Sequence, residues 1–114
     1  MWAVLKVYYG GDAWGSPDYE KLFFVTADRD LAATTVDLLN ENLKQAKELH
    51  ANPPRIEDLR TLSNPAVMNK YMLAKKKHDE KIQALLKEYD PKSDVDLHHD
   101  IDIKYYKFVE VEVR

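Results

Sequence analysis

The chain has 114 residues and a mass of 13.3 kDa, with 20 acidic and 17 basic residues, four histidines and no cysteine. This length predicts a single domain over 1–114, and a composition that is 45% hydrophobic and 32% charged is that of a globular protein. The lack of cysteine excludes disulfides, thiol nucleophiles and iron–sulfur clusters. The net charge of −3 argues against nucleic-acid binding, and no apolar run is long enough for a membrane span, so we expect a cytoplasmic protein.

Turn residues and the spacing of apolar residues divide the chain into strands and helices. Residues 10–18 contain all three glycines and predict a loop, while Pro54 and Pro65 mark helix boundaries. In chain order we expect a strand over 1–9, a loop over 10–18, a strand over 19–25, a helix from Thr26 or Asp28 to His50, a short helical turn over 55–62, a helix over 65–89 and a long strand over 94–114.

The last segment alternates with period two over an unusual length. Its odd positions from Val95 to Val113 are mostly apolar, so we expect the odd-numbered side chains to form the buried face. One strand of this length would span about 66 Å, so we expect either two strands that share a bend or one strand that overhangs the sheet. Together the elements predict an α+β domain, a small antiparallel sheet in β-β-α-α-β order with a helical hairpin packed on one face.

The middle of the second helix, residues 74–81, has almost no apolar side chain. A helix that is polar all round bridges solvent or receives a partner. Its lysines make this helix basic, whereas residues 90–103 are acidic. We expect these charges to neutralise one another within the fold or across a homodimer, and the alternative is a cationic surface for an acidic partner or a phosphate-bearing ligand.

Aromatic residues predict an interaction surface on the sheet. If the aliphatic positions Ala3, Leu5 and Val7 face the helices, the other side of the sheet carries aromatic residues and has no second layer over it. Such a patch is typical of an interface, most often between two copies of one chain. The alternative is that the 10–18 loop or the 53–63 connection covers it. The expected interface residues are Trp2, Tyr8, Tyr106 and Phe108.

Acidic and histidine residues cluster between Asp94 and Asp102. On a strand, Asp96, His98 and Asp100 would project from one face at intervals of about 7 Å, so neighbouring pairs could share a divalent cation. This predicts a site for a metal such as zinc, manganese or iron. The competing interpretation is a charged strand face that prevents edge-to-edge pairing of sheets.

The 10–18 loop and the basic helix suggest a second kind of site. Backbone amides at glycines approach anions closely, a tryptophan can stack on a ring, and lysines can contact phosphate. The residues concerned are Gly10, Gly11, Trp14, Lys75 and Lys76. The alternative is an ordinary flexible hairpin loop.

No catalytic motif is present: the three serines lie outside any G-x-S-x-G sequence, and the glycines form no phosphate-binding fingerprint. We therefore favour a non-catalytic accessory protein that binds another protein, requires no cofactor and acts as a homodimer. Short chains without cysteine and without catalytic motifs are typical of inhibitor-type accessory proteins of viruses or mobile elements, and we expect this chain to be one of them. Two alternatives stay open, a protein that sequesters a nucleotide or another phosphorylated small ligand, and a metal-dependent hydrolase or nuclease built on the 94–102 cluster.

Overall fold

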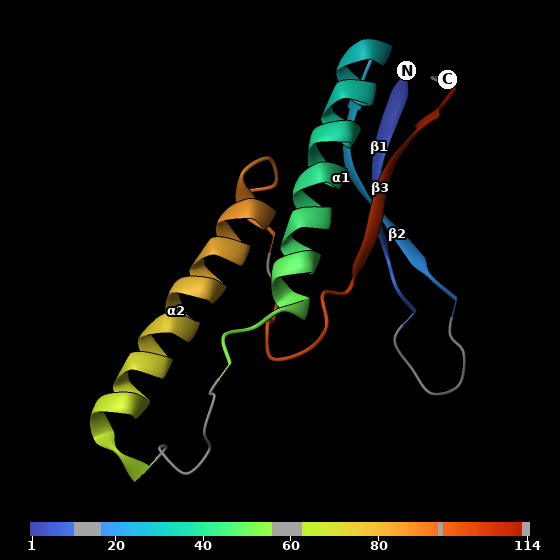
Figure 1. Cartoon of the computed structure of the whole chain (residues 1–114). Coiled ribbons are helices and arrows are strands. Elements are labelled where there is room, and N and C mark those ends of the chain that lie inside the picture. The colour runs from blue at the N-terminus through green and yellow to red at the C-terminus, as the bar shows by residue number, and fades with distance from the viewer. Residues whose placement is uncertain (11–16, 56–62, 94, 113–114) are drawn as a thin grey trace.

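The computed structural model describes residues 1–10, 17–55, 63–93 and 95–112. Its elements follow the expected β-β-α-α-β order (Figure 1). They are β1 (Trp2–Tyr8), β2 (Tyr19–Thr26), α1 (Arg29–Ala51), α2 (Pro65–Lys87) and β3 (Ile103–Glu110). Most of the short helical turn expected over 55–62, and all but one residue of the 10–16 part of the expected loop, lie outside the described residues.

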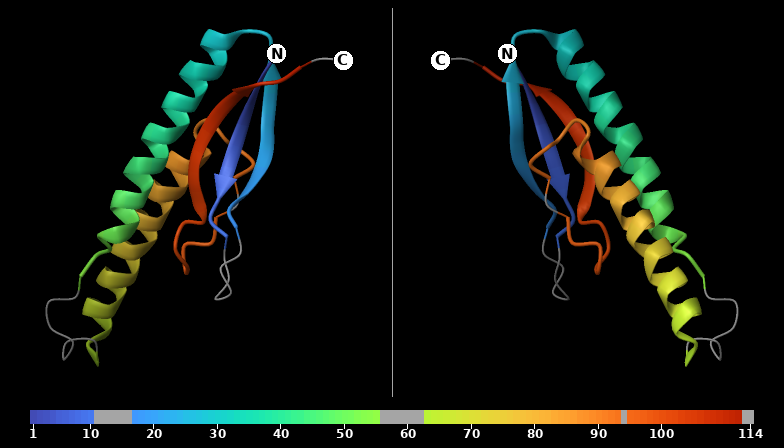
Figure 2. Two further views of the ribbon diagram at one scale, coloured as in Figure 1. Left: turned by 90° about the vertical axis from the view of Figure 1, so that its right-hand side faces the viewer. Right: turned by 90° about the vertical axis from the view of Figure 1, so that its left-hand side faces the viewer.

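The strands form one antiparallel sheet in the order β2-β1-β3. The two helices form a hairpin on one side of this sheet, which leaves the other side without a helical layer (Figure 2). Helix α1 packs against the strands, mainly β3, and α2 packs on α1. The predicted α+β architecture is therefore confirmed.

Helix α1 begins and ends as its sequence predicts. The side chain of Asp28 accepts a hydrogen bond from the backbone amide of Leu31 at 3.1 Å and caps the first turn. At the other end, the amide of Asn52 donates to the carbonyl of Leu49. Buried residues recur every three or four positions, which gives one apolar stripe along the helix. They are Ala32, Val36, Leu39, Leu43 and Ala46.

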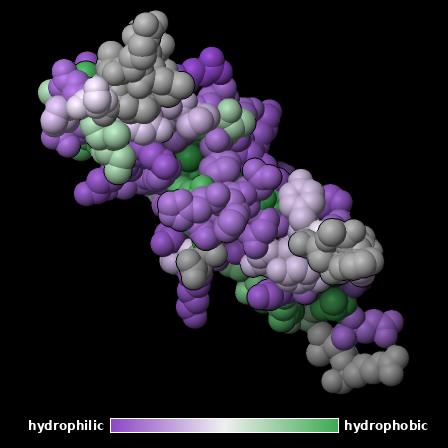
Figure 3. Space-filling model, turned by 90° about the horizontal axis from the view of Figure 1, so that it is seen from below, coloured by the Kyte–Doolittle hydropathy of each residue, from purple (hydrophilic) through white to green (hydrophobic). Residues whose placement is uncertain are grey.

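Helix α2 has its buried apolar side chains only near its C-terminal end. The Asn64 side chain caps it by accepting from the Ala66 amide at 3.0 Å, and Pro65 takes the first helical position. Its buried residues are Ile82 and Leu86, both in its last two turns. The preceding part extends beyond the sheet, in a molecule 65 Å long (Figure 1). Seen from the end where α2 begins, the surface is mostly hydrophilic, in agreement with the polar middle expected for this helix (Figure 3).

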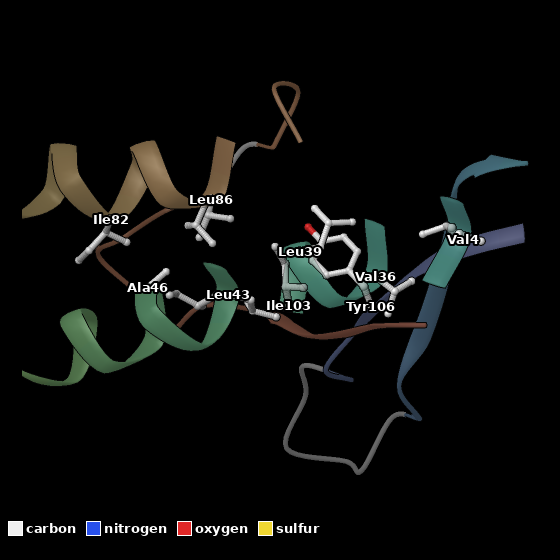
Figure 4. Packing of buried hydrophobic residues seen from close by; sticks show 12 residues of the cluster. Val4, Val36, Leu39, Leu43, Ala46, Ile82, Leu86, Ile103 and Tyr106 are labelled. Carbon is white, nitrogen blue, oxygen red and sulfur yellow. The ribbon is translucent and has the colours of Figure 1, made fainter. Parts of the chain in front are cut away.

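The core lies between the end of α2, the inner face of α1 and strands β1 and β3 (Figure 4). The largest fully buried side chains are Val4, Ile82 and Ile103, one from each of β1, α2 and β3. Figure 4 shows the ring of Tyr106 beside Leu39, where β3 meets α1. One continuous cluster therefore joins the sheet to both helices.

The prediction of a long strand over 94–114 is wrong in extent, because the strand found there is shorter. Strand β3 begins at Ile103, and the described residues before it, 95–102, form turns and irregular backbone. The buried side also changes along the segment, because the pairing of β1 with β3 shifts between Val7 and Tyr8. The extra residue on β3 is Lys104, so Ile103 and Tyr106 both reach the core although one is odd and the other even.

A second bulge lies between β1 and β2. Val4 pairs with Phe24 and Leu5 pairs with Leu22, which leaves Phe23 as the extra residue. Both phenylalanine rings consequently pack towards the core, and Leu22 lies on the other side of the sheet.

Candidate functional site

The four aromatic residues expected on the uncovered side of the sheet lie on the side of the helices. Tyr106 is 4% exposed and belongs to the core, and Trp2, Tyr8 and Phe108 pack against that core. The predicted face assignment is therefore wrong. On β1 the error comes from Lys6, whose charge makes the even side look exposed, and on β3 it comes from the extra residue that reverses the alternation.

Lys6 belongs to a buried polar cluster that the sequence did not reveal. Its Nζ lies 2.5 Å from Oδ2 of Asp90, and the hydroxyl of Tyr106 donates to the same oxygen at 3.0 Å. Lys6 is 8% exposed and Asp90 4% exposed. The cluster therefore joins β1, β3 and the turn that follows α2. A lone lysine inside an apolar strand, together with an aspartate directly after a helix, was the signal that could have found it.

This environment changes the acidity of Tyr106. Burial raises the pKa of Tyr106 well above its ordinary value. The negative charge of Asp90 and the hydrogen bond to it raise this pKa further. The folded protein consequently keeps this hydroxyl protonated in the pH range where tyrosines of an unfolded chain ionise, near pH 10.

We expect the free energy of unfolding to decrease as the pH rises above about 10, by up to about 1.4 kcal/mol per pH unit from this group. The unfolded chain releases a proton there that the folded chain retains, so the contribution is complete below the unfolded pKa. Urea unfolding at about pH 9 to 11 measures the slope. Tyr106→Phe should have a shallower slope, and equal slopes in the two proteins would contradict the expectation.

The other side of the sheet carries a mainly apolar surface, which we call the open face. Strand register assigns to it Ala3, Leu5, Val7, Leu22, Val25, Tyr105 and Val109. Ala3 and Val7 on the central strand are nearly enclosed by their neighbours, whereas the flanking residues Leu22, Val25 and Tyr105 are 61%, 43% and 40% exposed. No helix stands in front of this face among the elements drawn in the left view of Figure 2.

One ion pair crosses the open face. Lys107 Nζ lies 2.5 Å from Oε1 of Glu20, from β3 to β2 over the central strand. The hydrogen bond from Lys107 to Glu20 raises the pKa of the lysine. These opposite charges cancel, so the face is apolar with no net charge.

A similar pair lies beside the end of the sheet and involves a predicted ligand residue. Asp18 accepts hydrogen bonds from Lys104 at 2.6 Å and from the backbone amide of Gly10 at 3.0 Å. These two bonds lower the pKa of Asp18. The amide of Gly10, expected to be available for an anionic ligand, thus has an internal carboxylate partner.

The remaining residues of the predicted ligand site are not brought to Gly10. Gly11 and Trp14 lie outside the described residues. Lys75 and Lys76 are exposed on α2 and border a groove of about 1050 Å³ between that helix and residues 95–98. Figure 1 shows helix α2 and the end of β1 that leads to Gly10 on opposite sides of the molecule.

The predicted metal ligands do not form a strand face. Asp96 accepts a hydrogen bond from the backbone amide of His98 at 2.9 Å, within a turn, and lies 3.9 Å from the ring of His99. Asp96 and His98 border the groove beside α2, whereas Asp100 borders a different hollow next to α1. In the part of the chain that the structure describes, no three acidic or histidine side chains are grouped closely enough to hold a metal ion.

Two other histidines have structural contacts. His50 Nε2 lies 3.1 Å from the carbonyl oxygen of Leu97, and His78 Nε2 lies 2.7 Å from that of Leu49. They connect the end of α1 with the 95–102 segment and with α2.

Comparison with known proteins gives no relative: no family model, no curated protein and no solved structure matches this chain. Within the described ranges, neither helix is both long and apolar enough to cross a bilayer. Proposals on function therefore rest on the surfaces and clusters of the molecule itself.

Proposed function

We propose that this chain is a non-catalytic binding protein that acts as a homodimer, with the open face as the contact between the two copies. The exposure of Leu22, Val25 and Tyr105 on the side of the sheet that has no helical layer carries this proposal. Exposed apolar side chains grouped on one face of a sheet often mark an interface. The homodimer expected from the sequence is thus retained, but its contact lies on the opposite side of the sheet.

Charge supports a second copy as the occupant of this face. The charged residues whose strand positions fall on it, Glu20 and Lys107, have opposite signs and already form a pair. A two-fold axis brings the same surface of both copies together, which a neutral face tolerates and a face of one sign does not. Two sheets can then stack about 10 Å apart with their apolar side chains interdigitated.

Substitution on the open face tests the proposal. Val25→Lys combined with Tyr105→Lys places like charges in the contact from both copies and removes two apolar side chains. We expect native mass spectrometry to give a dimer for the unmodified chain and a monomer of about 13.3 kDa for the variant. Circular dichroism should stay unchanged, because lysine is well tolerated on edge strands.

The matched control makes the same kind of change elsewhere. Met72→Lys with Leu73→Lys also replaces two exposed apolar residues, 56% and 54% exposed, but on α2. This control should remain dimeric. A monomeric unmodified chain, or dissociation by the control rather than by the sheet variant, would contradict the proposed contact.

The projecting part of α2 is where we propose that a partner protein binds. Met68, Met72 and Leu73 are exposed there, and Met72 and Leu73 border the groove of about 1050 Å³. Methionine is common on surfaces that bind peptides or helices, because its flexible side chain adapts to the partner. An inhibitor-type role would follow from occupying a surface of that partner. The cytoplasmic location and the metal-dependent alternative stay predictions.

A further inference from the structure

Two lysines face each other across neighbouring strands. Lys6 on β1 and Lys21 on β2 are register partners, and both lie on the side of the sheet that faces the helices. Their ammonium groups lie over the ring of Tyr8, at 5.6 and 5.4 Å from its centroid. Like charges directly opposite each other destabilise a sheet, so this arrangement calls for a compensating negative charge.

Asp90 supplies only part of that charge. Its carboxylate is bonded to Lys6 and to the hydroxyl of Tyr106 within the buried cluster. A third lysine, Lys92, follows in the same turn and borders the same pocket as Lys6 and Lys21. Within the described ranges, Lys21 and Lys92 form no ion pair with an acidic side chain. Three lysines against one aspartate leave this pocket with a local charge of +2.

The pocket has room and a suitable wall for a small organic anion. Its volume is about 480 Å³, within the usual range for sites that bind small molecules. Besides the charged groups, its lining includes the rings of Tyr8 and Phe23 and the ring of Pro91. The Tyr8 ring already lies under the two ammonium groups and stacks on Tyr19 at 4.9 Å. A ligand would therefore meet cationic groups beside the rings of Phe23 and Pro91.

We propose that this pocket binds the phosphate group of a small aromatic phosphate monoester. Lys21 and Lys92 contact the phosphate oxygens, and the rings of Phe23 and Pro91 contact the organic part. A phosphate monoester carries close to two negative charges at neutral pH, which matches the local charge. The phosphate contacts of this inference are separate from the dimer contact, since Lys21 and Lys92 are not among the open-face residues; Leu22 at the sheet edge borders both sites. It also places the phosphorylated-ligand site at Lys21 and Lys92, beside the turn that follows α2, and not at Lys75 and Lys76.

Phenyl phosphate is the probe that combines both features. We expect chemical-shift changes at the backbone amides of Tyr8, Lys21 and Lys92 when it is titrated into the labelled full chain. Inorganic phosphate should shift the same amides with weaker affinity, because it lacks the ring. Phenol, which lacks the charge, should not shift them at equal concentration.

Lysine substitutions decide whether the pocket is responsible. Lys21→Gln and Lys92→Gln should each weaken phenyl phosphate binding by about tenfold, the loss expected for one charge-assisted contact. The matched control, Lys75→Gln with Lys76→Gln on α2, should leave the affinity unchanged.

Three results would overturn the proposal. They are no shift at these amides with millimolar phenyl phosphate, an unchanged affinity in both pocket variants, and an equal loss in the α2 control. A fourth result, phenol binding with the same affinity as phenyl phosphate, would also overturn it, because the site would then recognise the ring alone. None of these results affects the mass measurement that tests the dimer.

Discussion

Lys6→Met should lower the free energy of unfolding by about 3–5 kcal/mol. The substitution keeps the length of the side chain but leaves the carboxylate of Asp90, only 4% exposed, with one hydrogen bond from Tyr106. A buried charge that loses its partner costs far more than the intact pair contributes. Urea unfolding followed by circular dichroism measures the loss.

A second substitution separates the lost charge pair from lost packing. Lys6→Met combined with Asp90→Leu removes both charges, so it should be more stable than Lys6→Met alone. Lys104→Met, which breaks the exposed pair with Asp18, serves as the matched control and should have a much smaller effect. If Lys6→Met were as stable as the unmodified chain, the buried pair would not hold the turn after α2 against the sheet.

Ile82→Ala should lower the free energy of unfolding by about 2–5 kcal/mol. Ile82 is 0% exposed, and with Leu86 it supplies the buried surface of α2. The cavity left by the smaller side chain removes contacts with the stripe of α1 around Ala46 (Figure 4). Because so little else holds α2, amide hydrogen exchange along this helix should also accelerate.

Leu73→Ala is the control for that experiment, because Leu73 lies on the same helix but is 54% exposed. Its effect should stay within about 0.5 kcal/mol. Equal effects of the two substitutions would mean that the projecting part of α2 is as firmly packed as its end.

The existence and order of the elements could be predicted from local signals. The capping residues Asp28 and Asn64, Pro65 at the first helical position, and the leucine stripe of α1 all act within a few residues of where they stand. The polar middle of α2 also predicted a helix without continuous packing. These features need no knowledge of the tertiary fold.

The faces of the strands could not be predicted in the same way. Lys6 looks like an exposed residue until Asp90, 84 positions away, is known to lie beside it. The extra residues Phe23 and Lys104 reverse the alternation, and nothing in their immediate sequence indicates a bulge. We therefore propose the interface on the open face. The sequence did not reveal the cationic pocket, because its lysines come from β1, β2 and the turn after α2.

Filtered nuclear Overhauser measurements on a mixture of labelled and unlabelled protein test directly whether the open face contacts a second copy of the chain. We expect intermolecular contacts at the methyl groups of Leu5, Val25 and Val109 and at the ring of Tyr105. Intermolecular contacts confined to Met72 and Leu73 of α2, or none at millimolar protein, would rule out the open face as the dimer contact.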